Sequence, residues 1–263
     1  MKRNICRQLG WIALSVALAT DAGAIIGGTQ DSGHPAVALM LDTMTGIECS
    51  GSLIAPQVLL TAAECIAGDS DASHYTVLGG ATAFAAPDWS VGVSSVVVNP
   101  AYDFMTFSND VGVLLLASAP PVSPFPWLAT DPGGAYFPGI HFTAVGYGVS
   151  NAQSESGDGV RRMVGLTISI ADASTFRIDA TGGKSPCIGD QGGPALEVVN
   201  QVETVIGTFA YGDQACAQFA VYERTDANAT FIAAYAPEPG AATSGGVASA
   251  LLAWRARRRP CSS

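Results

Sequence analysis

The chain has 263 residues and a formal net charge of −10, with 48% hydrophobic and 13% charged residues. That length fits one or two domains, and the low charge with 30 glycines and 15 prolines favours short strands joined by many turns. Most cations lie in the first seven and the last nine residues, so the body of the chain is more acidic than the total suggests. An acidic body repels phosphate backbones, which argues against nucleic acid as a partner.

The N-terminal segment has the features of a secretory signal peptide. Basic residues 1–7 precede the apolar stretch 9–20, which is too short to span a bilayer comfortably. The triplet "AGA" at 22–24 matches an A-x-A cleavage site. We therefore expect residues 1–24 to be removed and the mature chain to begin at Ile25. Export also permits disulfide formation.

The body of the chain contains a series of β-type runs separated by turn residues. Short strands at this spacing indicate an antiparallel barrel or sandwich. Residues 151–159 are polar and predict a surface loop, whereas 226–236 predict a helix with Asp226 or Asn228 as its cap. The expected strands lie within 36–43, 51–63, 75–80, 91–100, 110–117, 141–148, 161–171, 193–199, 203–212 and 218–225.

The composition changes at "PEPG", residues 237–240. A short run of small and apolar residues follows at 241–254, and "RARRR" at 255–259 is basic. This order resembles the C-terminal sorting signals of some Gram-negative bacteria, although the apolar run is shorter than the ~20 residues of a full membrane span. The resemblance implies a bacterial protein, secreted or at the cell surface, with transient membrane association through residues 237–263. The alternative is a disordered basic tail.

Six cysteines occur, and removal of the signal peptide takes Cys6 away. The natural local pairs are Cys49 with Cys65 and Cys187 with Cys216, although sequence alone does not fix connectivity. Cys261 is then left over, and removal of the tail would remove it.

Several segments carry a resemblance to one family. Their order and spacing resemble those of the trypsin-like, chymotrypsin-fold serine peptidases over roughly residues 25–236. The resemblance implies an all-β fold of two six-stranded antiparallel β-barrels with a short C-terminal helix, and it implies both cysteine pairs. The segments are "IIGGT" (25–29), "CSGSLIAPQVLLTAAEC" (49–65), "SNDVGVLLLASAP" (108–120), "CIGDQGGPA" (187–195), "TFAYG" (208–212) and "AVYERT" (220–225).

By this resemblance, the three positions of the catalytic triad fall on Glu64, Asp110 and Gln191. The chemistry needs a histidine base, a carboxylate that orients it and a serine nucleophile, so only Asp110 has the expected residue type. Gln191 cannot be a nucleophile, because its amide nitrogen is delocalised into the carbonyl. Glu64 would face Asp110 across the space of the missing imidazole, so at least one of the two pKa values should be raised.

The resemblance also assigns residues that do not depend on the triad. Gly189, together with the backbone N–H at position 191, would form the oxyanion hole. Asp190 would pair with the free ammonium of Ile25, and the alternative is cleavage nearby with Asp190 capped by backbone donors. Ser185 would form the floor of a specificity pocket that lacks an acid, and the adjacent wall would come from Ala210, Tyr211 and Gly212.

These observations predict a secreted serine-protease homologue that is catalytically inactive, is expected to be monomeric and binds a protein or peptide through its vestigial cleft. No metal or other cofactor is expected. One alternative is a trypsin-like serine endopeptidase with residual activity. The other is a non-peptidase reaction that uses the carboxylates of Glu64 and Asp110.

Overall fold

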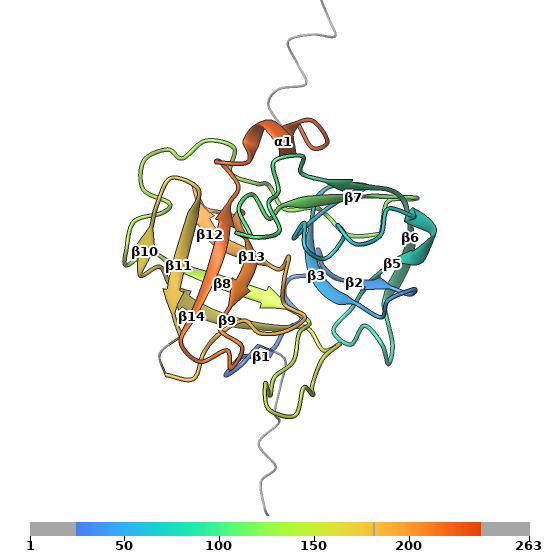
Figure 1. Ribbon diagram of the computed structural model, residues 1–263, viewed down its shortest axis with the longest axis horizontal. Helices are drawn as coiled ribbons and strands as arrows, with labels where there is room; N and C mark the ends of the chain where they lie inside the picture. Colours follow the sequence, from blue (N-terminus) through green and yellow to red (C-terminus); the bar gives the residue numbers. More distant parts are fainter. Residues whose placement is uncertain (1–24, 181, 238–263) are drawn as a thin grey trace, which may run out of the picture.

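The computed structural model describes residues 25–180 and 182–237, which form two β-rich halves side by side (Figure 1). Residues 1–24 and 238–263, where the signal peptide and most of the tail were predicted, lie outside the described residues. The first half is a closed antiparallel barrel. Its strands, in the order of their pairing, are β2 (Val37–Asp42), β3 (Glu48–Ala55), β4 (Val58–Thr61), β7 (Gly112–Leu116), β6 (Trp89–Val98) and β5 (Tyr75–Gly79).

The second half is an antiparallel sheet of eight strands. The all-β prediction with a short C-terminal helix is thereby confirmed, and the six-stranded barrel is found in the first half. In the second half, six longer strands are extended at each edge by a two-residue strand, β1 or β10. The order is β1 (Thr29–Gln30), β9 (Arg162–Thr167), β8 (His141–Gly146), β12 (Pro194–Val199), β13 (Val202–Gly212), β14 (Phe219–Arg224), β11 (Thr175–Asp179) and β10 (Ile170–Ala171).

Each half has its own apolar core because alternate strand residues point inward. In β6, Trp89, Val91 and Val93 are buried and the residues between them are exposed. In the second half, Phe176 stacks on Tyr222 with their ring centroids 5.0 Å apart. A third cluster joins the halves, so the junction between them is packed rather than open.

Most predicted strands are present, with several differences. The run 161–171 contains two strands, β9 and β10, and β1 was not predicted. The run 51–63 is not one strand, because the chain turns at Pro56 and Gln57 between β3 and β4. Strand β11 was missed, although Phe176 and Ile178 alternate with more exposed residues along it. A short 3-10 helix, η1 (Ala72–His74), also precedes β5.

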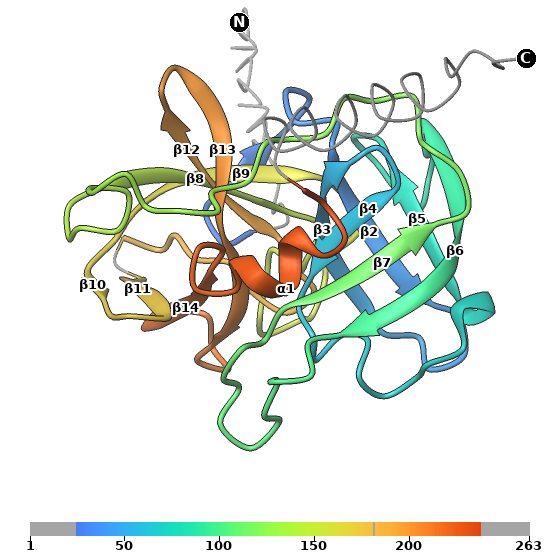
Figure 2. The same ribbon diagram turned by 90° about the horizontal axis from the view of Figure 1, so that it is seen from above.

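The predicted helix is present but shorter than expected. Helix α1 (Ala229–Ala233) lies at the junction of the two halves, and its Ile232 packs in the third core cluster (Figure 2). Asn228 occupies the N-cap position, but its side chain makes no capping hydrogen bond and contacts Asn99 and Glu223 instead. Turns at both ends replace the remaining predicted helical residues.

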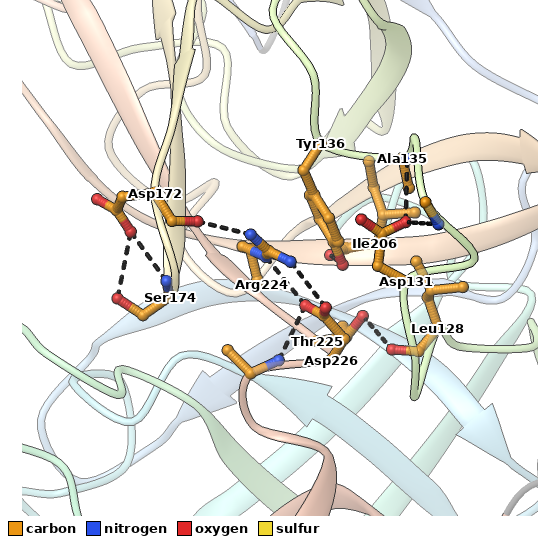
Figure 3. A network of polar contacts seen from close by, with 12 residues as sticks. Leu128, Asp131, Ala135, Tyr136, Asp172, Ser174, Ile206, Arg224, Thr225 and Asp226 are labelled. Atoms are coloured by element: carbon orange, nitrogen blue, oxygen red, sulfur yellow. Dashed lines mark hydrogen bonds and ion pairs between the residues drawn. The ribbon is translucent and has the colours of Figure 1, made fainter.

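Arg224, at the end of β14, fixes the chain where it leaves the sheet for α1 (Figure 3). Its guanidinium donates to both carboxylate oxygens of Asp226, at 3.0 and 2.8 Å, and to the carbonyl of Asp172 at 2.6 Å. It also lies 3.9 Å from the ring centroid of Tyr136. This bidentate, stacked arrangement is specific to arginine.

Both predicted disulfides are confirmed, Cys49–Cys65 and Cys187–Cys216. Each should stabilise the fold by about 2–4 kcal/mol. Within residues 25–180 and 182–237, no helix is long and apolar enough to cross a membrane.

Candidate functional site

The three triad positions come together at the junction of the two halves. Glu64 follows β4, Asp110 precedes β7, and Gln191 lies three residues before Pro194, the first residue of β12. Asp110 is fully buried, and its Oδ1 accepts a hydrogen bond of 2.7 Å from the backbone N–H of Glu64. The other oxygen, Oδ2, is buried and has no hydrogen-bond partner among the described residues.

Burial and mutual repulsion keep these acids from ionising easily. Burial raises the pKa of Glu64 to about 7. Burial also raises the pKa of Asp110 to about 7, and the nearby charge of Glu64 adds to that shift. The predicted raised pKa is therefore present at both positions. At neutral pH the carboxyl groups of Glu64 and Asp110 are therefore partly protonated.

A third acid, Glu223 on β14, belongs to the same cluster and was not predicted. Glu223 is 1% exposed, and burial raises its pKa to about 7, with a further contribution from the charge of Asp110. Its carboxyl accepts a hydrogen bond from Asn228 at 3.3 Å. The only sequence signal was a single acid that follows three apolar residues in "AVYERT". Glu64, Asp110 and Glu223 are called the acid cluster below.

The side chain of Gln191 turns back onto its own loop. Its Oε1 accepts a hydrogen bond of 2.7 Å from the backbone N–H of Gly189. The resemblance assigns that N–H to an oxyanion hole, and in this structure the amide oxygen of Gln191 occupies the donor.

The loop around Gln191 is held by its backbone. Gln191 accepts a hydrogen bond at its carbonyl from the N–H of Ser50 at 2.8 Å. The Ser50 hydroxyl donates to the carbonyl of Gly189 at 2.9 Å and accepts from the N–H of Tyr147 at 2.9 Å. Gly189 has φ +88°, and a Cβ there would lie 2.9 Å from the Cα of Gly148, so only glycine fits.

Asp190 points away from the cleft and is 1% exposed. Its two oxygens accept hydrogen bonds of 2.8 Å from the backbone N–H groups of Gly148 and Cys187. Burial raises its pKa to about 7, opposed by these hydrogen bonds and by the charge of Arg162. Ile25 is fully buried in the core of the second half. The Ile25–Asp190 ion pair stays a prediction, because it requires a chain cleaved after residue 24.

The four predicted pocket residues differ in their exposure. Ser185 is fully buried, and its hydroxyl donates to the carbonyl of the neighbouring Pro186 at 2.9 Å. Ala210 is fully buried, whereas Tyr211 is half-buried and its ring lies 5.5 Å from that of Phe107. Gly212 is exposed at the end of β13.

A cavity lies beside Gln191. It has a volume of about 520 Å³, and its lining includes Glu64, Gly189, Gln191 and the Cys49–Cys65 disulfide. None of Ser185, Ala210, Tyr211 or Gly212 lines it. Part of the predicted surface loop 151–159 does, which its polar composition alone did not indicate. The structure thus brings Glu64, Gly189 and Gln191 together around one cavity, with Asp110 buried and hydrogen-bonded to the N–H of Glu64, and it leaves the predicted pocket wall outside the cavity.

Comparison with known proteins identifies the family of this chain. The family model described as Trypsin matches residues 25–232. The chain belongs to the trypsin family. It is 31% identical to the chymotrypsin of Phaedon cochleariae over 188 residues, which are 65% of this chain and 66% of that protein. It is also 31% identical over 188 residues to the brachyurin of Leptuca pugilator, covering 65% of this chain and 80% of that protein.

One relative of the trypsin family is named as inactive. The inactive CLIP domain-containing serine protease A3 of Aedes aegypti is 28% identical over 200 residues, which are 62% of this chain and 40% of that protein. Membership of the trypsin family and two disulfides are together typical of an extracellular protein.

The acid cluster of this trypsin family member consists of carboxyl groups alone. The described residues contain no group of three or more His, Cys, Asp or Glu side chains that could hold a metal ion. What the arrangement can do chemically is to accept or release protons near neutral pH and to present carboxyl oxygens to a ligand.

Proposed function

We propose that this protein is a secreted member of the trypsin family that does not cleave peptides and binds a protein or peptide through the cleft beside Gln191. The observation that carries the proposal is the 2.7 Å hydrogen bond from the N–H of Gly189 to the amide oxygen of Gln191. The residue at the nucleophile position has no nucleophilic atom, and the same residue blocks the group that would stabilise the transition state.

Glu64 supports the same conclusion from the base position. Its carboxyl has no serine to activate, and removal of the nucleophile or the base from a serine protease costs on the order of a millionfold in turnover. By contrast, both disulfides and the backbone contacts of the Gln191 loop are present. A cleft that has its supports but lacks its reacting groups suits binding rather than turnover.

A serine-directed fluorophosphonate probe tests the absence of activity. We expect no covalent labelling of the secreted protein and no cleavage of peptide substrates. The double variant Glu64→His with Gln191→Ser is the positive control, and we expect it to be labelled, whereas Gln191→Ser alone, which lacks a base, should label far more slowly. Labelling of the unaltered protein would show residual peptidase activity and overturn the proposal.

The raised pKa values of Glu64 and Asp110 favour one rival, a reaction that uses a protonated carboxyl as a general acid. The reaction class closest to two facing carboxyls is glycoside hydrolysis. Hydrolysis of a chromogenic glycoside that is lost in Glu64→Ala and retained in the exposed control Asp88→Ala would establish this rival in place of the binding function.

Export is the part of the proposal that concerns residues 1–24 and the tail. We expect N-terminal sequencing of the secreted protein to begin at Ile25, which would create the ammonium that pairs with Asp190. Any other start removes that pair. We expect mass spectrometry to find the tail, residues 241–263, absent from the mature protein, and an intact tail would argue against sorting.

A further inference from the structure

The cavity beside Gln191 is formed by segments far apart in the sequence. One wall is the edge of β3 with Ile47 and Glu48, a second is the 149–158 loop, and a third is Ile188 to Gln191. Ile47 and Ile188 are large apolar side chains that are 42% and 41% exposed at this cavity. The volume of about 520 Å³ lies within the range of small-ligand sites, about 300–1,000 Å³.

The charge of this cavity is entirely negative. Its lining includes Glu48, Glu64, Glu155 and Asp158, and no lysine, arginine or histidine is among its described lining residues. Glu48 and Asp158 come within hydrogen-bonding reach of each other, although they are 110 positions apart in the chain. Two carboxyls in such contact repel one another unless a proton or a cation lies between them.

We propose that the cavity binds an arginine or lysine side chain of a partner polypeptide, with an apolar residue next to it in the partner packing on Ile47 and Ile188. The positive group would lie between Glu48 and Asp158, where it replaces their repulsion with two attractive contacts. A guanidinium fits best, because it can donate to two carboxylates at once in a fixed geometry. This inference rests on the proposed binding function and adds the chemistry of the ligand.

Two short peptides test the role of the charge. The probes are acetyl-Gly-Leu-Arg-Leu-Gly-amide and the same peptide with citrulline, which has the shape of arginine without its charge. Binding to the full chain is measured by isothermal titration and by the NMR shifts of backbone amides around the cavity. We expect the arginine peptide to bind about tenfold more tightly, which corresponds to about 1.4 kcal/mol. Its affinity should fall as salt is added.

Matched variants locate the effect. Glu48→Gln and Asp158→Asn each remove one negative charge from the cavity, and each should weaken the arginine peptide several-fold without changing the citrulline peptide. The control is Asp179→Asn, which removes one exposed charge from β11, where Asp179 pairs with Arg177 and does not line the cavity. We expect this control to leave both affinities unchanged.

The outcomes separate the two proposals. Equal affinity for both peptides at the cavity, unaffected by Glu48→Gln, overturns the cationic ligand and leaves a binding cleft. No shift of cavity amides at millimolar concentration of either peptide counts against both proposals, and cleavage of either peptide overturns the proposed function. If removal of residues 238–263 raises the affinity severalfold, the occupant is the chain's own arginine-rich tail and not a partner.

Discussion

Two buried polar clusters of this protein differ in how their charges are balanced. In the first, called the paired cluster here, Asp31 and Arg161 are each 2% exposed and are joined by a hydrogen bond of 2.9 Å from Nε to Oδ2. His34 contacts the other oxygen of Asp31, also at 2.9 Å. Burial acts to raise the pKa of Asp31, but the hydrogen bonds from His34, Gly33 and Arg161 hold it well below its usual value.

The acid cluster of Glu64, Asp110 and Glu223 lacks such compensation. All three pKa values are raised to about 7, and no described cation lowers any of them. The two clusters therefore differ in how the fold accommodates buried acidic groups. The paired cluster holds its charges within the fold because they have partners, whereas the raised pKa values of the acid cluster mean that the fold keeps protons on its carboxyl groups.

The largest expected effect comes from breaking the paired cluster. Arg161→Met should lower the free energy of unfolding by about 3–5 kcal/mol, because it leaves the Asp31 carboxylate buried without its partner. Urea unfolding at pH 7 measures the loss. The control Arg177→Met removes a partly exposed arginine that pairs with Asp179 and should cost less than about 1 kcal/mol. Equal losses in the two variants would show that the paired cluster contributes no more than a surface ion pair.

The next effect comes from neutralising the acid cluster. Asp110 has a folded-state pKa of about 7 against an ordinary value of 3.8, so the folded chain holds a proton that the unfolded chain has released between these pH values. Its contribution to stability therefore falls as pH rises from about 4 to about 7. Asp110→Asn should stabilise the protein by about 1–3 kcal/mol at pH 8 and change little at pH 4.

Thermal unfolding at several pH values checks this prediction. Asparagine can still accept the hydrogen bond from the N–H of Glu64, so the geometry is preserved. The control Asp88→Asn changes an exposed acid and should leave the pH profile of the protein as it was. A loss of stability in Asp110→Asn at pH 8 would mean that the Asp110 carboxylate is charged and favourable there.

The smallest effect concerns the hydrogen bond within the Gln191 loop. Gln191→Ala removes the acceptor of the Gly189 N–H and should lower stability by about 0.5–1.5 kcal/mol. Hydrogen exchange of the Gly189 amide should become faster, while that of the Gly192 amide, which donates to the Phe209 carbonyl, should not. Unchanged exchange at Gly189 would show that the glutamine does not occupy this donor in solution.

Much of the fold could be predicted because its signals are local. Alternating apolar residues marked most strands, and the motifs around Cys49, Cys187 and Asp110 gave the family, the disulfides and the convergence of the triad positions. Strand β11 was missed because its five residues carry only two inward-facing apolar side chains. Asn228 takes the N-cap position as predicted, but its side chain makes no capping hydrogen bond because its amide contacts Asn99 and Glu223.

The parts of the site that could not be predicted depend on tertiary contacts. Glu223 in its strand is indistinguishable from an acid that faces solvent until β14 is placed against Asp110. The meeting of Glu48 and Asp158 depends on how the 149–158 loop folds over β3. The direction of the Gln191 side chain depends on where the Gly189 N–H points, which no residue pattern specifies.

The backbone contacts of the Gln191 loop hold position 191 in place independently of its side chain. Gly192 has no room for a side chain, since a Cβ there would lie 2.2 Å from both the Ser50 carbonyl oxygen and the Thr61 Oγ1. The N–H of Ser50 donates a hydrogen bond to the backbone carbonyl of residue 191, and any amino acid at position 191 can accept it. The side chain at position 191 can therefore be exchanged for another, because Gly189 and Gly192 keep the backbone of the loop in the same conformation.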